Sequence, residues 1–164
     1  MTSPATMPAT MPDIRSLVPH SGGMVLLERV LSADDENLCA EVRIHAGSVL
    51  ATADGVGSWA GIEYMAQAIA AHAGWLAGRR GDAVKVGFLL GSRKYEASVP
   101  YFALGSVLRV HVHRVLQAEN GLGAFDCRIE SADAAPGAAS LATATVTVFQ
   151  PDNVNQFLKD GNVA

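Results

Sequence analysis

The chain has 164 residues and a formal net charge of −4, with 49% hydrophobic and only 17% charged residues. This length fits one domain with a sizeable core, and the acidic balance, with no basic cluster larger than Arg79-Arg80, argues against a protein that binds nucleic acid. So few charges predict that a partner covers part of the surface, most simply a second copy of the chain.

The chain begins with a segment of low complexity. Residues 1–12 repeat the letters ATMP and contain three prolines, which predicts a disordered leader. They lack the basic start and the apolar run of a secretory signal. Because Cys39 and Cys127 also lack CxxC spacing, we expect two reduced thiols in the core of a cytoplasmic protein. One folded domain then spans 13–150, and 151–164 form a polar C-terminal tail.

Two strands are predicted in the first third of the chain. After a short helical turn capped by Asp13, residues 23–31 have the composition of a strand. In 37–45, apolar residues occupy every second position, which indicates a strand with one buried face. A loop rich in small residues, 46–57, follows.

A long apolar segment, GVGSWAGIEYMAQAIAAHAGW at 55–75, is predicted to form a helix. The stretch from Trp59 to Ala77 approaches the length needed to span a membrane. Glu63, Gln67 and His72 interrupt it, however, and its many small residues leave it weakly hydrophobic. The sequence therefore predicts a buried helix of a soluble protein and no membrane span.

Four more strand candidates follow the helix, and they lie at 84–98, 105–117, 121–131 and 139–149. Short turns separate them, which is typical of antiparallel pairing. A single apolar helix can be buried by such strands only if their sheet curls around it. The predicted fold class is therefore α+β, with about six strands wrapped around one long central helix.

The one carboxylate on this helix is its most informative residue. With 3.6 residues per turn, Glu63 and Gln67 project together towards one small region. They lie beside an apolar stripe that includes Trp59, Ile62 and Ile69. A carboxylic acid held in an apolar cleft could keep its proton and act as a general acid.

The start of the helix could serve the same chemistry. The N–H groups of a first turn lack helical partners, and the helix dipole favours negative charge there. Around Gly57, Ser58 and Trp59 they could stabilise the oxyanion that forms on a carbonyl group. A plainer alternative also stays open, in which Glu63 lies at this end only because the dipole favours it.

Two segments in the correct order carry a resemblance to a known family. LVPHSGGMVLLERV (17–30) and GIEYMAQAIAAHAGW (61–75) resemble the 3-hydroxyacyl-acyl-carrier-protein dehydratases, a family of hotdog-fold proteins. SRKYEASVPYFALGSVLRVHVHRV (92–115) is similar to a later strand pair of that family. The likeness covers about 14–149, and it is closest to the predicted dehydratase branch of aryl polyene pigment pathways.

The resemblance implies a hotdog fold of six antiparallel strands, dimerisation edge to edge, and an acyl tunnel at the dimer interface. It implies dehydration of a 3-hydroxyacyl thioester, carried by acyl carrier protein or coenzyme A, to the trans-2-enoyl product. A homodimer is expected, and a heterodimer with a related dehydratase stays open. The family's helix carboxylate, which works opposite a histidine of the other subunit, corresponds to Glu63. No metal or other cofactor is expected, because side chains can carry out both proton transfers.

The chain departs from the family at the catalytic histidine. That residue usually lies in a loop fourteen residues before the carboxylate, where this chain has Val49. His20 is the best substitute base, since the family places a histidine of this segment beside the acyl tunnel. His45 is expected to lie at the surface and His72 to be structural. A partner subunit of different sequence is a further source of the missing group.

We therefore predict a pair of catalytic residues, His20 as base and Glu63 as acid. The residues predicted to bind the substrate are Gly57, Ser58, Trp59 and Gln67. Two alternatives stay open: an acyl thioesterase in which the same carboxylate activates water, and a non-catalytic subunit of a heterodimeric dehydratase.

A metal site is not predicted. His111 and His113 share one face of a strand, but Arg109 on the same face opposes a cation. Two ligands without a third at a fitting spacing favour a solvated strand face.

Overall fold

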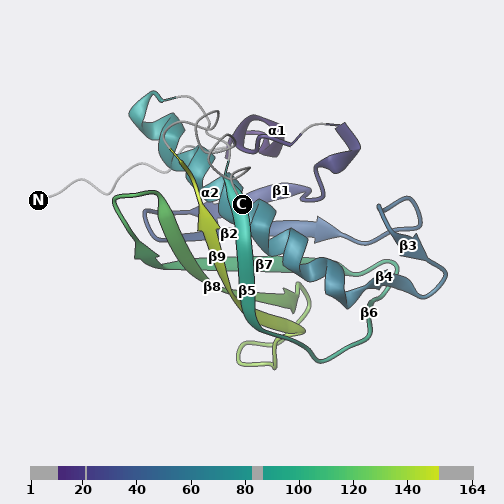
Figure 1. The fold of residues 1–164 in the computed structure, drawn as a ribbon. Helices are drawn as coiled ribbons and strands as arrows, with labels where there is room; N and C mark the ends of the chain where they lie inside the picture. Colours follow the sequence, from purple (N-terminus) through teal and green to yellow (C-terminus); the bar gives the residue numbers. More distant parts are fainter. Residues whose placement is uncertain (1–10, 21, 83–86, 152–164) are drawn as a thin grey trace, which may run out of the picture.

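The computed structural model describes residues 11–20, 22–82 and 87–151. A six-stranded antiparallel sheet with strand order β1-β2-β7-β8-β9-β5 forms most of it. Figure 1 shows this sheet curving around α2 (Gly61–Arg80), with α1 (Ile14–Leu17) on the other side of the helix. The strands are β1 (Arg29–Ala33), β2 (Asn37–Arg43), β5 (Phe88–Ala97), β7 (Val107–Gln117), β8 (Leu122–Ser131) and β9 (Ala142–Phe149). The predicted α+β class is confirmed.

A second, smaller sheet lies beside the start of α2 (Figure 1). Its order is β3-β4-β6, and its strands are β3 (Ala51–Thr52), β4 (Gly55–Gly57) and β6 (Tyr101–Phe102). The sequence predicted a loop for residues 46–57, because strands of two or three residues are too short to show alternation. The 3₁₀ turn η2 (Ser58–Ala60) then leads from β4 into α2.

The predicted strand at 23–31 is wrong in its first half. Gly22–Met24 form a 3₁₀ turn, η1, and β1 begins only at Arg29. The physical reason is a tertiary hydrogen bond: the Leu26 N–H donates to the side-chain oxygen of Gln67 on α2, at 2.9 Å. This part of the chain is therefore tied to the helix and not to a neighbouring strand.

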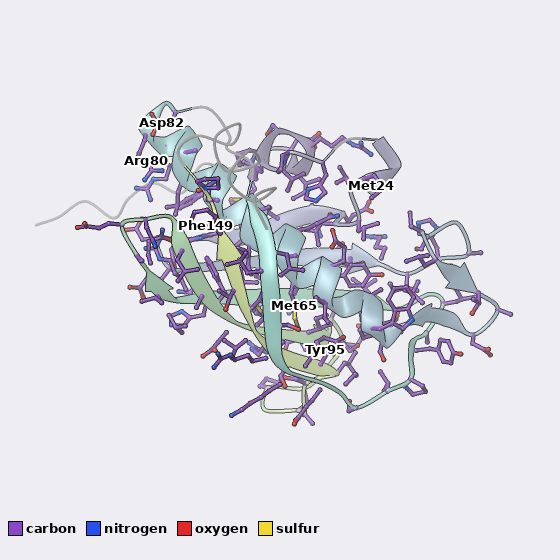
Figure 2. The ribbon with its side chains drawn as sticks, in the orientation of Figure 1. Met24, Met65, Arg80, Asp82, Tyr95 and Phe149 are labelled. Carbon is purple, nitrogen blue, oxygen red and sulfur yellow. The ribbon has the colours of Figure 1, made fainter. Side chains whose placement is uncertain are left out.

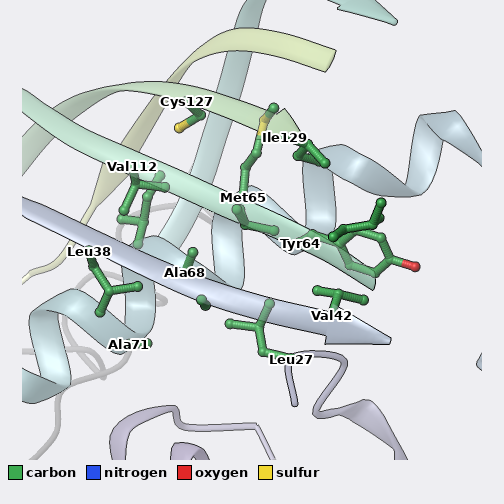
Figure 3. Packing of buried hydrophobic residues seen from close by; sticks show 14 of the residues in the cluster. Leu27, Leu38, Val42, Tyr64, Met65, Ala68, Ala71, Val112, Cys127 and Ile129 are labelled. Atoms are coloured by element: carbon green, nitrogen blue, oxygen red, sulfur yellow. The ribbon is translucent and has the colours of Figure 1, made fainter. Parts of the chain in front are cut away.

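The helix packs most closely against β2 and β7. In Figure 3, Met65 and Ala68 of α2 lie among Leu38 of β2, Val112 of β7 and Ile129 of β8, and the Met65 side chain extends towards Ile129. All of these side chains are at most 2% exposed. Burial of these side chains is one part of the hydrophobic stabilisation that the larger core cluster provides.

The C-terminal end of α2 has an ordinary glycine cap. Gly81 has a left-handed φ of 74°, and its N–H donates to the carbonyl oxygens of Ala77 and Gly78. The apolar stripe expected on the helix is wrong at its first member, because Trp59 lies in η2 and is 62% exposed. Buried residues occur on several sides of α2, since α1 covers one side and the sheet wraps the others.

Some predictions fall outside the described residues. The leader 1–12 is described only at positions 11 and 12, and the tail 151–164 only at Pro151. Cys39 and Cys127 are both buried and free. Cys127 belongs to the hydrophobic core, as expected, whereas Cys39 lies outside that cluster, opposite His111 of β7. Among the helices of the described ranges, none is long and apolar enough to cross a membrane.

His72 ties α2 to the β1–β2 turn. Its side chain is 1% exposed, and Nε2 donates to the carbonyl oxygen of Asp34 at 2.9 Å. The ring also meets Phe125 edge to face, with centroids 6.0 Å apart. Burial lowers the pKa of His72 below its ordinary value. The residue is structural, as the sequence predicted.

The buried imidazole of His72 predicts a pH dependence of stability. Because its pKa is lowered on folding, the unfolded chain binds more protons below about pH 6.5, and the free energy of unfolding falls there. The glutamine in the His72→Gln variant does not titrate. The variant is less stable near pH 7, and the difference in the free energy of unfolding between it and the unsubstituted protein should narrow between about pH 7 and pH 5. Urea unfolding at several pH values measures this, and parallel curves for the two proteins would contradict it. The lowered pKa values of Asp34, Glu41 and Glu130 act only at more acidic pH.

Candidate active site

His20 and Glu63 lie together at the mouth of a cavity. His20 follows α1, and Glu63 projects from the first turn of α2. The distance from His20 Nε2 to Glu63 Oε1 is 3.7 Å, and their side chains are 28% and 44% exposed. Both line a cavity of about 140 Å³. The structure thus brings together the two residues predicted as base and acid, and it leaves Glu63 at the rim of the cleft and not deep inside it.

The cavity runs between one face of α2 and the strands β5, β8 and β9. On the helix side its wall consists of Ile69 and three small residues, Ala66, Ala70 and Ala73. The opposite wall includes Phe125, and the walls together are mainly apolar. A narrow apolar space that starts at a histidine and a carboxyl group can hold an acyl chain with its reactive carbons at the mouth.

A fully buried amide fixes the geometry of this mouth. The Gln67 side chain is 0% exposed, and its Nε2 donates to the Met24 carbonyl oxygen at 2.7 Å and to Glu63 Oε1 at 3.2 Å. Its Oε1 accepts the Leu26 N–H at 2.9 Å. Gln67 therefore orients the carboxyl group and anchors the segment that follows His20. The spacing of four residues between Glu63 and Gln67 predicted their contact.

The backbones of α1 and α2 approach each other closely, and this contact fixes the position of α1 and of His20 beyond it. A Cβ atom built on Gly74 of α2 would lie 1.9 Å from the carbonyl oxygen of Leu17. Only glycine leaves room for this contact. Because His20 is three residues beyond Leu17, the position of the imidazole depends on Gly74. No signal in the sequence distinguishes this glycine from the others on the helix.

The residues predicted to hold a carbonyl group lie away from the cavity. Gly57, Ser58 and Trp59 are absent from its lining, and the Ser58 N–H already donates to the Pro100 carbonyl oxygen at 3.0 Å. A Cβ on Gly57 would lie 2.2 Å from Trp59 Nε1, so the indole covers that glycine. For Gly57, Ser58 and Trp59, contact with a substrate stays a prediction.

The family's histidine position lies at the surface. Val49 is 44% exposed and outside the cavity lining. His45 is exposed as well, and its Nδ1 accepts the Gly47 N–H at 3.1 Å. Neither segment brings an imidazole to Glu63 within this chain. His20 is therefore the histidine that the chain itself supplies to the site.

The outer face of the sheet carries paired charges. His111 Nε2 lies 2.7 Å from Glu130 Oε1, and Arg128 donates to Glu130 Oε2 at 2.7 Å. Although burial opposes it, these two partners lower the pKa of Glu130. Cys39 Sγ lies 3.9 Å from His111 Nε2, but burial raises the pKa of this thiol to about 11, so the thiol stays protonated near neutral pH. Across residues 11–20, 22–82 and 87–151, no group of three or more His, Cys, Asp or Glu side chains could hold a metal ion.

Comparisons with known proteins identify relatives of this chain. A family model described as the ApeP dehydratase, of the ApeP-like family, matches residues 12–159. The chain is also similar to a solved chain of the dehydratase heterocomplex ApeI:P from Xenorhabdus doucetiae. The two are 30% identical, the match covers 93% of this chain and 99% of that one, and the TM-score is 0.82. None of the curated proteins compared with the chain matches it.

More distant solved structures share the fold alone. One is a hypothetical thioesterase with coenzyme A from Streptococcus pneumoniae TIGR4, with 16% identity, coverage of 74% and 84%, and a TM-score of 0.56. Another is Cj0977, a sigma28-regulated virulence protein from Campylobacter jejuni, with 14% identity, coverage of 85% and 97%, and a TM-score of 0.55. The predicted hotdog fold is confirmed.

Two glycines on α2 provide a test of how His20 is placed. Gly74→Ala should push α1 away from the helix, which lowers stability by about 1–3 kcal/mol and displaces His20 from Glu63. The matched control is Gly78→Ala one turn later, where a Cβ would meet nothing within 4 Å. This control should gain about 0.5–1 kcal/mol from its better helix propensity. Thermal unfolding compares the two variants, and equal effects would refute the close approach.

Proposed function

The chain belongs to the ApeP-like dehydratase family, and we propose that it converts 3-hydroxyacyl thioesters on acyl carrier protein to trans-2-enoyl thioesters. The family places this dehydration in aryl polyene biosynthesis. The observation that carries the proposal is the spacing of 3.7 Å between His20 Nε2 and Glu63 Oε1 at the mouth of an apolar cavity. These two groups are suited to the two proton transfers that a dehydration needs.

In the proposed reaction, His20 Nε2 removes the proton from C2 of the substrate. Glu63 begins as the carboxylic acid and gives its proton to the hydroxyl group on C3, which leaves as water while the C2–C3 double bond forms. Gln67 and His20 both approach Oε1 of Glu63. The proton that Glu63 transfers is therefore assigned to Oε2.

The same pair can reset itself after turnover. The reaction leaves His20 protonated and Glu63 ionised, 3.7 Å apart. The proton returns from Nε2 to the carboxylate directly or through the water just formed, which restores both starting states. No net proton is gained or lost over the cycle.

We assign the edge of β5 to a second subunit. In the described sheet β5 is the last strand, and Leu90 on it is 55% exposed. An exposed strand edge with apolar side chains is a template for pairing with another chain. Gly87 and Leu89 line the cavity and are themselves exposed, so a strand paired along β5 would close the cavity on that side. The dehydratase heterocomplex similar to this chain supports a related dehydratase as the partner.

A specific observation favours a second candidate, a non-catalytic subunit. Val49 stands where the family has its catalytic histidine, and its side chain is exposed and is not part of the cavity lining. In that case the partner carries out the dehydration, and this chain supplies the cavity wall and the surface for assembly. The two candidates differ in whether His20 and Glu63 are needed for turnover.

Substitution of the proposed acid tests the mechanism. In the complex with its dehydratase partner, Glu63→Gln should lower the rate of enoyl formation by about 10²–10⁴-fold, because the proton donor is lost. His20→Gln should have a comparable effect. The control is His45→Gln, on an exposed histidine with no contact to Glu63, which should keep full activity. Ultraviolet absorbance of the enoyl thioester measures turnover.

The products separate the remaining alternatives. Full activity of the complex with Glu63→Gln would support the non-catalytic subunit. Release of free acid and free thiol, in place of an enoyl thioester, would identify a thioesterase.

A charge placed on the proposed pairing edge should weaken assembly. Leu90→Lys puts an ammonium group on β5, where a neighbouring strand would have to cover it. The dissociation constant of the subunit pair should rise about tenfold or more, which corresponds to 1.4 kcal/mol. Val115→Lys on β7 is a matched control, since Val115 is a 50% exposed apolar strand residue away from that edge. Analytical ultracentrifugation measures both, and equal effects would argue against β5 as the interface.

A further inference from the structure

We propose that Tyr95 is a positioning residue whose hydroxyl group ties the edge strand β5 to the start of α2 and thereby holds Glu63 in place. The inference rests on the proposed function, because it concerns how the proposed acid is held. It follows from an irregularity in β5, from one hydrogen bond and from one glycine.

The irregularity is a β-bulge in β5. Arg93 pairs with Thr145 of β9 and Glu96 with Thr143, so three steps along β5 match two along β9. Lys94, within the bulge, has a left-handed φ of 54°. Bulges of this kind change the direction in which a strand side chain points. Tyr95 is half-buried, whereas Lys94 and Glu96 on either side of it are exposed.

The hydroxyl group of Tyr95 donates a hydrogen bond to the carbonyl oxygen of Ser58 in η2. The same carbonyl oxygen accepts the N–H of Gly61, the first residue of α2. The Ser58 N–H donates to the Pro100 carbonyl oxygen at 3.0 Å. Residues from the end of β5 and the turn after it therefore hold η2 through both its N–H and its carbonyl group. Figure 2 labels Tyr95 near the end of β5 that leads into this turn.

Gly61 is the glycine that this contact requires. A Cβ at this position would lie 2.3 Å from the Tyr95 hydroxyl oxygen and 2.9 Å from Cδ1 of Ile129. A side chain at this position would therefore displace the Tyr95 hydroxyl group and the end of Ile129. Glu63 is two residues further along the same turn. A shift of the helix start passes to the Glu63 carboxyl group, which has to stay 3.7 Å from His20.

The Tyr95 hydroxyl group keeps its proton near neutral pH and can therefore donate a hydrogen bond. Burial raises the pKa of Tyr95 to about 12, so the phenol stays neutral. Its acceptor is a backbone carbonyl, which has no ionisation of its own. The hydrogen bond should therefore persist across the pH range in which a dehydratase works.

Removal of the hydroxyl group tests the inference in the assembled complex. Tyr95→Phe keeps the aromatic ring and loses only the hydrogen bond to Ser58. We expect kcat to fall about tenfold with KM unchanged, because a small displacement of a catalytic group lowers the rate of the chemical step and not substrate binding. The matched control is Tyr101→Phe on β6, at a tyrosine whose side chain is 43% exposed, and it should leave both constants unchanged.

A double-variant comparison shows whether Tyr95 acts through Glu63. Glu63→Asp withdraws the carboxyl group by one methylene, and Tyr95→Phe should then cost less than it does beside the intact glutamate. Equal fold-changes in the two backgrounds would overturn the inference, because they would mean that the two residues act independently.

Two structural measurements test the inference independently of catalytic activity. Hydrogen exchange of the peptide covering 58–66 should become faster in Tyr95→Phe and stay unchanged in Tyr101→Phe. Gly61→Ala should lower the melting temperature less in the Tyr95→Phe background, since the nearest clash is removed. Unchanged exchange in Tyr95→Phe would refute the inference. Faster exchange together with full activity of Glu63→Gln would refute the proposed function and leave the link between Tyr95 and the helix standing.

Discussion

The candidate site depends on the buried amide of Gln67. Its side chain joins the backbone at Met24 and Leu26 to α2, and one of its donors also reaches Glu63. Because the Gln67 amide is fully buried, the loss of one of its backbone partners would cost about 1–3 kcal/mol, which holds the segment after His20 in this position. One polar residue in an otherwise apolar helix therefore orients the carboxyl group and secures the chain that carries the imidazole.

The two sides of α2 have separate tasks. On one side, Met65 and Ala68 pack tightly against β2 and β7, and this contact stabilises the fold. On the other side, Ala66, Ala70 and Ala73 are only half-buried because they border the cavity. Small side chains on this second face leave space beside His20 and Glu63 without weakening the packing on the first face. Because the sheet curves around α2, one helix can both pack against the sheet and line the cavity.

The sequence predicts those features that arise from local periodicity. The long helix, most of the strands and the contact between Glu63 and Gln67 could all be derived from residue spacing. His20 could be chosen only through a family resemblance, because nothing in its own neighbourhood marks it as reactive. The apolar stripe with Trp59 was wrong, since a helix buried on several sides has little amphipathic contrast. Gly74 and Tyr95 could not be identified at all, since their roles depend on backbone that is distant in sequence.

The cavity has an open flank at Gly87 and Leu89, where the wall is the unpaired margin of β5. In the proposed complex, the subunit that pairs along this margin would form the remaining wall of the cavity for the acyl chain. The length and shape of chain that can be accommodated then belong to a pair of polypeptides and not to either one. Exchange of one partner subunit for another would then alter the range of substrates without a substitution in this chain. Mutations in the genes of the two subunits would have to be selected jointly.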